Sequence, residues 1–211
     1  MPFTHLEVHS HFTLLGATPS VDALAARASA EGMTHLALTD SEALYGAVAF
    51  TRACRRCDVR PVIGMALAVH LPPDLAAREA QLGQLVLLAA NRAGYRSLSR
   101  LASIVQGNPN RDPSSPAGIP WSTLAEQREG LICLSGGVDA ALYRLLRRGD
   151  ASAAQLLAGK LAGLFDERAV LSLQIDGPDD QAIAGQVTTI GRRLGLPVVA
   201  VQPVYCLDRS E

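Results

Sequence analysis

The sequence is poor in aromatic residues and in charge. Phe, Trp and Tyr make up 4% of its 211 residues and charged residues 18%, with a formal net charge of −1. A domain that binds DNA through its phosphates usually carries a basic excess, and one that binds single strands usually offers aromatic rings on which bases stack. We therefore expect DNA contact by this chain to be weak or indirect.

Cysteines are few, and long apolar segments are missing. Four cysteines in a chain of this length are not typical of a disulfide framework, which favours a reducing compartment. No apolar run approaches the roughly 20 residues of a membrane-spanning helix. The opening MPFTHLEVHSH lacks the basic start and apolar stretch of a signal peptide. A cytoplasmic protein without membrane contact is expected.

Apolar residues make up 48% of the chain, enough to bury the core of one large domain. Short β-rich runs alternate with helical patterns. The expected strands are 5–8, 35–39, 61–69, 85–89, 131–135, 169–175 and 197–201, and the expected helices lie near 20–31, 42–57, 92–105, 138–148, 151–164 and 179–194. The strands are almost wholly apolar, as parallel strands covered on both faces are. The pattern predicts an α/β fold with a closed or nearly closed barrel, or alternatively an open doubly wound sheet.

One segment interrupts this alternation. Residues 106–120, QGNPNRDPSSPAGIP, have the composition of an exposed loop. Thr123 and Glu126 follow with the spacing of a capping box, which predicts that a short helix starts there.

The stretch SGGVD at 135–139 resembles the pyrophosphate-binding loop SGGxDS of ATP pyrophosphatases. Here, however, it follows the fifth expected strand, and Ala140 stands where those loops carry serine. A tight strand-to-helix turn is the better explanation of the two glycines.

Chemistry in a β/α barrel is placed at the carboxyl ends of the strands. Of the residues expected there, only Glu7 and His9 form a pair that is typical of metal ligands, since alternate residues of a strand face the same side. A carboxylate and an imidazole suit Zn²⁺ or Mn²⁺, but a metal ion needs more than two protein ligands. A hydrogen-bonded pair is the alternative.

The stretches FTHLEVHSHFTLLGA and GMTHLALTDSEALYGAVAFTRACRRCDVRPVIGM resemble the PHP (polymerase and histidinol phosphatase) domain, most closely that of the alpha subunit of bacterial DNA polymerase III. LVLLAANRAGYRSLSRL, GLICLSGG and LPVVAVQPVYCL continue the resemblance. It implies a distorted TIM-like (β/α)7 barrel, a single PHP domain over residues 1–211, and a longer polymerase that continues past Glu211.

Active members of that family hold three metal ions with His, Asp, Glu and Cys ligands. The resemblance places the corresponding positions on residues most of which cannot act as metal ligands. The vestigial site positions are Glu7, His9, Gly16, Asp40, Ser41, Ala66, Gln84, Gly137, Pro203 and Tyr205. We expect no catalytic residue and no metal ion in this domain; if any ion binds, Glu7 and His9 hold it. Without metal ions, Glu7 and Asp40 should pair with His9, His11, a nearby arginine or water.

Other candidates point to structure or surface. Cys54 and Cys57 form C-x-x-C late in an expected helix, whereas redox pairs favour a helix N-terminus. Arg52, Arg55, Arg56 and Arg60 form a local basic patch of the kind that faces solvent, and His35 and His70 flank strands.

The resemblance implies a non-catalytic domain of a replicative DNA polymerase III alpha subunit, which supports the polymerase and offers a docking surface. Its partners would be the rest of the polymerase chain and the proofreading exonuclease subunit. The parent chain would be a DNA-directed DNA polymerase, a nucleotidyltransferase that uses Mg²⁺ outside this domain. The alternative is a residual metal-dependent phosphoesterase or 3′–5′ exonuclease.

Overall fold

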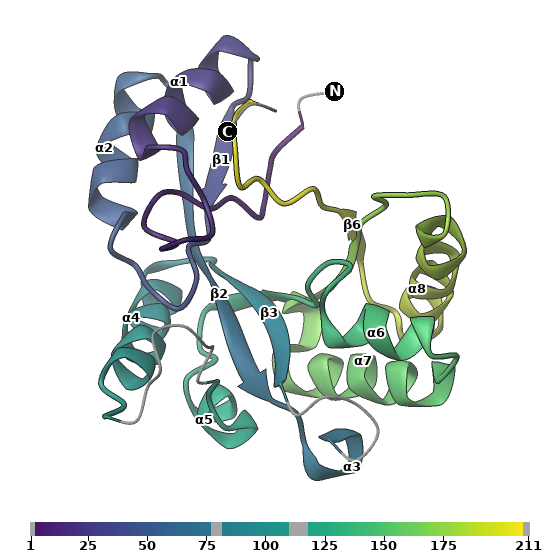
Figure 1. Cartoon of the computed structure of the whole chain (residues 1–211). Coiled ribbons are helices and arrows are strands. Elements are labelled where there is room, and N and C mark those ends of the chain that lie inside the picture. Colours follow the sequence, from purple (N-terminus) through teal and green to yellow (C-terminus); the bar gives the residue numbers. More distant parts are fainter. Residues whose placement is uncertain (1–2, 77–81, 110–117, 209–211) are drawn as a thin grey trace.

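The computed structural model describes residues 3–76, 82–109 and 118–208. Its six strands form one curled sheet whose strand order follows the sequence (Figure 1). The strands are β1 (His35–Leu38), β2 (Arg60–His70), β3 (Leu82–Ala89), β4 (Leu131–Leu134), β5 (Ala169–Leu173) and β6 (Val198–Ala200). All lie within or next to the ranges that the sequence predicts.

The strand directions are mixed, and here the expectation of parallel strands is wrong. β1 and β2, β4 and β5, and β5 and β6 pair in parallel, but β3 runs antiparallel to both β2 and β4. A parallel connection needs a crossover of a dozen or more residues. Only residues 71–81 separate β2 from β3, and the described part of this connection, up to residue 76, holds the short helix α3 (Pro73–Ala76), so the chain returns antiparallel.

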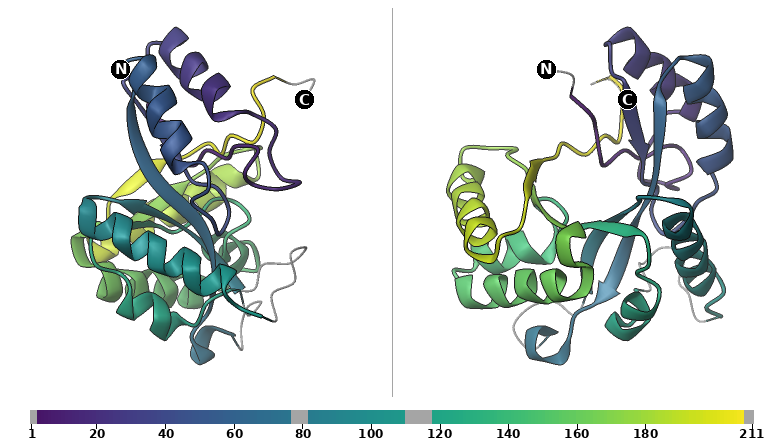
Figure 2. Two further views of the ribbon diagram at one scale, coloured as in Figure 1. Left: turned by 90° about the vertical axis from the view of Figure 1, so that its left-hand side faces the viewer. Right: turned by 180° about the vertical axis from the view of Figure 1, so that it is seen from behind.

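The first expected strand, 5–8, forms no regular ladder but makes a few backbone hydrogen bonds to both ends of the sheet. On one side, the amides of Ala37 and Thr39 donate to the carbonyls of His5 and Val8, at 3.1 and 2.8 Å. On the other, the His9 amide donates to the Val204 carbonyl at 2.9 Å. This N-terminal segment thus lies between β1 and the residues after β6, where Val8 and Val204 form a parallel bridge, and the purple and yellow segments meet in the right-hand view of Figure 2. The fold is a distorted TIM-like barrel.

Helices cover the outside of the curl. They are α1 (Val21–Ala30), α2 (Ala47–Arg56), α4 (Arg92–Gln106), α5 (Trp121–Glu126), α6 (Ala141–Arg147), α7 (Ala151–Phe165), the 3₁₀ turn η1 (Asp166–Arg168) and α8 (Asp180–Leu194). Ser20, Asn91 and Asp150 cap α1, α4 and α7 by accepting a bond from a first-turn amide. Within the described ranges, no helix is long and apolar enough to span a membrane.

The capping-box prediction at Thr123 is wrong. α5 begins at Trp121, and Pro120 stands before it with no side-chain cap, so Thr123 and Glu126 both lie inside the helix. The extended conformation of Pro120 fixes the entry of the chain instead. Of the loop expected at 106–120, residue 106 ends α4, and residues 110–117 lie outside the described residues.

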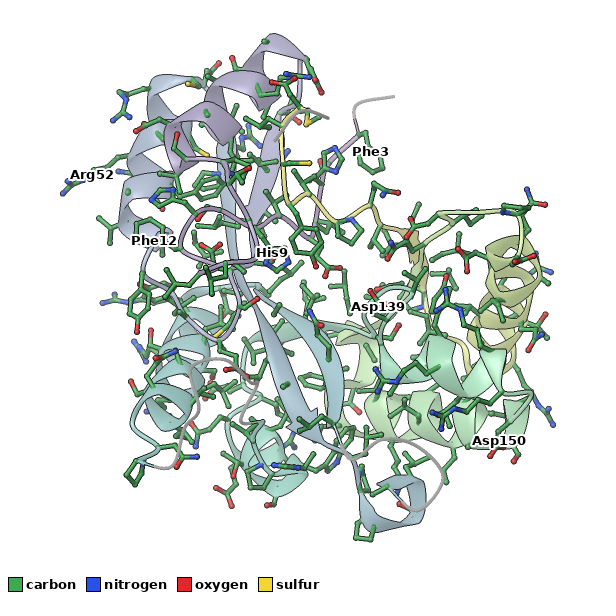
Figure 3. The ribbon with its side chains drawn as sticks, in the orientation of Figure 1. Phe3, His9, Phe12, Arg52, Asp139 and Asp150 are labelled. Carbon is green, nitrogen blue, oxygen red and sulfur yellow. The ribbon has the colours of Figure 1, made fainter. Side chains whose placement is uncertain are left out.

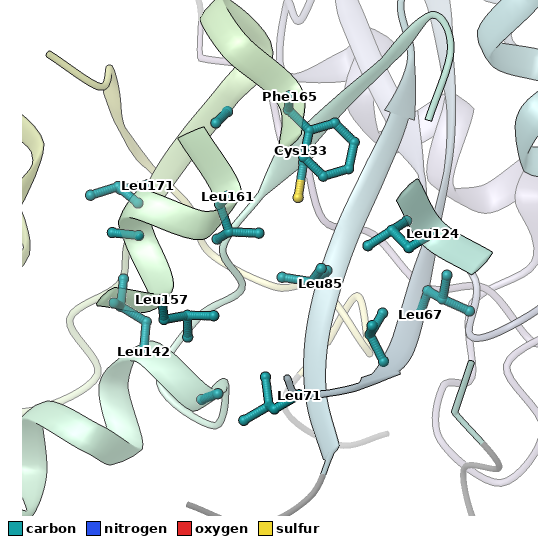
Figure 4. Close-up of a cluster of buried hydrophobic side chains, with 14 of the residues drawn as sticks. Leu67, Leu71, Leu85, Leu124, Cys133, Leu142, Leu157, Leu161, Phe165 and Leu171 are labelled. Atoms are coloured by element: carbon teal, nitrogen blue, oxygen red, sulfur yellow. The ribbon is translucent and has the colours of Figure 1, made fainter. Parts of the chain in front are cut away.

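The largest core cluster lies between the sheet and α4 to α8, and Figure 4 shows Leu67, Leu85, Leu157 and Phe165 among its members. A smaller cluster lies inside the curl. Its buried members are Ala37, Val86, Leu88, Leu134 and Val201, from β1, β3, β4 and the segment after β6. These side chains fill the interior of the barrel, so polar groups at the strand ends gather above an apolar floor.

Candidate functional site

Glu7 and His9 face the same side of the N-terminal segment, as the sequence predicts. Both are buried, with 3% and 0% of their surface exposed, and Glu7 Oε1 lies 3.9 Å from His9 Nε2. Among the described residues, Glu7 Oε2 and His9 Nε2 find no hydrogen-bond partner. A buried carboxylate oxygen without a donor is costly.

Hydrogen bonds through Thr13 assign the proton of His9. The Thr13 hydroxyl donates its single proton to Asp40 Oδ1 at 2.9 Å, because an ionised carboxylate can only accept. His9 Nδ1 lies 3.2 Å from the same Thr13 oxygen and therefore donates to it. His9 Nδ1 consequently carries a proton, and Nε2 of the same ring faces Glu7.

Asp40 accepts hydrogen bonds from neutral groups of its own chain, and not from the histidine or arginine expected from the sequence. Its Oδ1 accepts the Ser10 amide at 2.7 Å and the Thr13 hydroxyl, and its Oδ2 accepts the Ser10 hydroxyl at 2.9 Å. His11 contributes nothing to Asp40, since its Nδ1 lies 3.3 Å from the Pro19 carbonyl. Asp40 therefore anchors the turn that follows the N-terminal segment.

Tyr205 covers His9 from the other end of the chain. Their ring centroids are 4.5 Å apart, with planes 11° from parallel. Burial, then the negative charges of Glu7 and Asp139, raise the pKa of Tyr205 to about 12, although 42% of the residue's surface is exposed. The phenol therefore stays neutral over the physiological range.

Glu7 and Tyr205 border a pocket of about 230 Å³, here called the mouth pocket. Five vestigial positions line it: Glu7, Gln84, Gly137, Pro203 and Tyr205. Asp139, Gln174, Asp176 and Gln202 complete most of its polar wall. Figure 3 labels His9 in the N-terminal segment and Asp139 just ahead of α6, on the two sides of the mouth.

The other vestigial positions lie apart from it. Ser41 and Ala66 line a neighbouring pocket of about 420 Å³, which shares Gln84 and Asp139 with the mouth pocket. Gly16 lines neither pocket and closes a turn, its amide donating to the Thr13 carbonyl at 3.0 Å. Sequence reasoning missed Gln174, because the strand was expected to reach residue 175. β5 ends at Leu173, so Gln174 is the first residue after the strand, the position at which site residues are expected in a β/α barrel.

The SGG stretch forms the tight turn that its glycines predict. Gly136 has a φ of +80°, which favours glycine, and a Cβ on Gly137 would lie 1.8 Å from Gln174 Oε1. Gln174 Oε1 accepts the Val138 amide at 3.1 Å, while its Nε2 donates to Asp176 Oδ2 at 2.7 Å. The turn thus binds a glutamine side chain of its own chain.

The remaining candidates lie away from the mouth. Cys54 is buried in the last turn of α2, and Cys57 follows that helix; both are free. Burial raises the pKa of Cys54 to about 12, which opposes thiolate chemistry. Arg52, Arg55 and Arg60 are exposed, and Arg56 pairs with Asp22. His35 and His70 line neither pocket.

The donor set does not fit a trinuclear metal cluster. Over 3–76, 82–109 and 118–208, no three His, Cys, Asp or Glu side chains gather closely enough to hold a metal ion. Glu7 and His9 supply two metal-ligating groups, and the carboxylate of Asp40 is occupied by hydrogen bonds from the turn at Ser10. Zn²⁺ sites need four ligands, at least three of them usually from protein.

Residues 5–175 match the family model of the PHP domain. The chain belongs to the PHP domain family. It is 28% identical over 211 residues to the DNA polymerase III subunit alpha of Bacillus subtilis, covering 100% of this chain and 18% of that protein. The corresponding subunit of Escherichia coli is 32% identical over 210 residues, covering 99% and 18%. An error-prone DNA polymerase of Symbiobacterium thermophilum is 32% identical over 226 residues, covering 100% and 20%.

This PHP domain matches the N-terminal region of DNA polymerase III alpha subunits and spans about a fifth of the length of these relatives. Solved structures agree on the fold. An amidohydrolase of Chromobacterium violaceum, with sulfate bound and no metal, superposes with a TM-score of 0.64 at 12% identity, over 96% of this chain and 87% of that one. A two-domain protein of Bacteroides vulgatus with a predicted PHP-like metal-dependent phosphoesterase gives 0.58 at 8% identity, over 96% and 52%.

Proposed function

We propose that this chain is the non-catalytic PHP domain of a bacterial replicative DNA polymerase III alpha subunit. It supports the polymerase and offers a docking surface for the rest of that chain and for a proofreading exonuclease subunit. In this proposal the Mg²⁺ of DNA synthesis binds elsewhere in the polymerase, and the protein works in the cytoplasm.

The observation that carries the proposal is the shortage of metal donors at the mouth. Phosphoester hydrolysis by two or three metal ions requires each ion to be held and a water to be activated. At the mouth, amides, a proline and a phenol stand at the vestigial positions Gln84, Pro203 and Tyr205. A family member with this donor set retains the barrel without the means to hold the cluster.

Exposed apolar side chains support a docking role. Leu14 and Leu15 are 82% and 108% exposed at a turn, and Tyr45 and Val48 are 62% and 59% exposed at the start of α2. Leu14 and Tyr45 line one pocket, and large apolar groups exposed side by side mark interaction surfaces. We assign this surface, residues 14, 15, 45 and 48, to the rest of the polymerase chain, because the relatives extend far beyond the region matched here.

One observation favours the alternative, a residual phosphoesterase or exonuclease. Glu7 Oε2 and His9 Nε2 are buried and unpartnered among the described residues, so the pair could hold one cation with water as the remaining ligands. Such a site would need water at half or more of its coordination positions.

Metal analysis and hydrolysis assays separate the two functions. After incubation with Zn²⁺ or Mn²⁺ and desalting, we expect the 211-residue chain to retain less than one ion per molecule. It should hydrolyse phosphoesters and DNA 3′ ends at background, and His9→Ala should change neither result. Metal-stimulated hydrolysis that disappears in His9→Ala would replace this proposal by the enzymatic one.

Docking is tested in the full-length polymerase. We expect Leu14→Glu combined with Tyr45→Glu to weaken DNA synthesis or subunit assembly while the barrel stays folded. The matched control is Leu156→Glu, on the 40% exposed side of α7. Unchanged synthesis and assembly in the double variant would contradict the docking surface. Loss of the exonuclease subunit alone would reassign the surface to that partner.

A further inference from the structure

Acidic side chains line the mouth pocket, while Arg144 and Arg147 donate hydrogen bonds to the backbone carbonyls of Asp139 and Val138 in its wall. Glu7, Asp139 and Asp176 supply three carboxylates, and in the described part of the chain neither Lys nor Arg lines the pocket. Asp176 is partly satisfied by Gln174. Such a site attracts cations and repels phosphate groups.

A second observation points to a missing ligand. Glu7 lines the pocket, is 3% exposed, and its Oε2 accepts no hydrogen bond from any described residue. A desolvated carboxylate in this condition calls for an N–H or O–H donor. Burial raises the pKa of Tyr205, and the nearby charges of Glu7 and Asp139 raise it further.

The size and walls of the pocket distinguish among cations. Its volume of about 230 Å³ corresponds to roughly seven or eight waters at the liquid density of about 30 Å³ each, far more than one bare ion needs. No three metal-ligating side chains gather among the described residues. Gln84 and Gln202 add amide groups whose oxygens accept N–H donors, and Pro203 and Tyr205 offer an apolar side against which methylene groups pack.

We propose that the mouth pocket binds an organic cation, an ammonium or guanidinium group, that donates hydrogen bonds to Glu7 Oε2 and lies between Asp139 and Asp176. The bound cation supplies the positive charge that the side chains lining the mouth pocket lack. It comes either from a free amine or from a Lys or Arg side chain of a docked protein. The inference goes beyond the proposed function, since it holds whether or not the chain supports a polymerase.

The test is a titration of the ¹⁵N-labelled 211-residue chain followed by NMR. The probes are spermidine as a free amine and the blocked peptide Ac-Gly-Lys-Gly-NH₂ as a side-chain source. Ac-Gly-Gln-Gly-NH₂ is the neutral control. Zn²⁺ and inorganic phosphate are titrated separately as the alternative ligands, a metal ion and an anion. We expect saturable shifts of the Gly137 and Val138 amides and of the Gln84 and Gln202 side-chain amides with the cationic probes. Tighter binding of spermidine assigns the site to a free amine, and tighter binding of the peptide assigns it to a side chain.

Substitutions locate the site. Removing the acceptor charge in Glu7→Gln should weaken binding of the cationic probes about tenfold or more, as loss of a hydrogen bond to a charged group does. The matched control is Glu167→Gln in the exposed η1, which should bind as wild type. Asp139→Asn, at an exposed position, should weaken binding about two- to threefold and provides the test if Glu7→Gln does not fold.

Three results would overturn the proposal. The first is the absence of saturable shifts with either amine. The second is saturation by Zn²⁺ or phosphate at concentrations where the amines do nothing. The third is wild-type affinity for the amines in folded Glu7→Gln and Asp139→Asn variants.

Discussion

The ring of Tyr205 lies on the imidazole of His9, with centroids 4.5 Å apart and planes 11° from parallel. One residue earlier, Val204 exchanges backbone hydrogen bonds with the same segment, donating to Glu7 and accepting from His9 at 3.1 and 2.9 Å. The stack and the bonds join two parts of the chain that are nearly its whole length apart. They close the barrel at the point where the mouth pocket opens.

The phenol of Tyr205 should ionise only at unusually high pH. Burial and the charges of Glu7 and Asp139 raise its pKa from 10.0 to about 12. Because the folded state holds this proton more tightly than the unfolded state, the associated stability is complete below about pH 10 and is lost as the pH rises toward 12. An ultraviolet difference titration of wild type against Tyr205→Phe measures the ionisation. A difference curve with an ordinary midpoint near 10 would contradict the burial and charges assigned here.

Asp40→Asn should destabilise the fold by about 1–3 kcal/mol. The charged carboxylate accepts the Ser10 amide and the hydroxyls of Ser10 and Thr13, and an amide group loses both the charge and one acceptor. Urea unfolding measures the change. Asp58→Asn is the control, since Asp58 is exposed and has a φ of +55° that asparagine tolerates. Equal stabilities for the two variants would show that Asp40 does not anchor the turn.

Leu87→Asp should destabilise the barrel by several kcal/mol, because it places an unpaired charge at a fully buried position of β3. Leu156→Asp, at a 40% exposed position of α7, should cost far less. Thermal unfolding of the chain gives the comparison. In the full-length polymerase, Leu87→Asp should also reduce DNA synthesis or subunit assembly. Normal synthesis and assembly despite an unfolded domain would oppose a supporting role.

Replacing two helical glycines by alanine should change the stability of the fold in opposite directions. In Gly94→Ala, the new Cβ would lie 2.1 Å from the Gly130 carbonyl oxygen, so the start of α4 must move and stability must fall. In Gly159→Ala, inside α7, the Cβ meets nothing within 4 Å, and stability should rise by about 0.5–1 kcal/mol. Chemical unfolding of both variants checks the signs. A neutral Gly94→Ala would mean that the close approach to Gly130 relaxes without cost.

Local patterns predicted much of the fold. The apolar runs located all six strands, and the helical patterns located α1, α2, α4, α6, α7 and α8, although α2 starts at Ala47 instead of near 42. Glu42 has a φ of +54°, a conformation that the sequence does not signal at a non-glycine residue. The direction of β3 was missed, because a strand buried on both faces is apolar whichever way it runs.

The sequence by itself determined the family, the alternation of strands and helices, the shared face of Glu7 and His9, and the glycine turn at Gly136. Each depends on neighbouring residues or on a motif read along the chain. Only the tertiary structure decided that Tyr205 covers His9, that Gln174 fills the space beside Gly137, and that three carboxylates line one pocket. These contacts join residues that lie far apart in the sequence, and their partners are set by how the sheet curls, a property that no local pattern encodes.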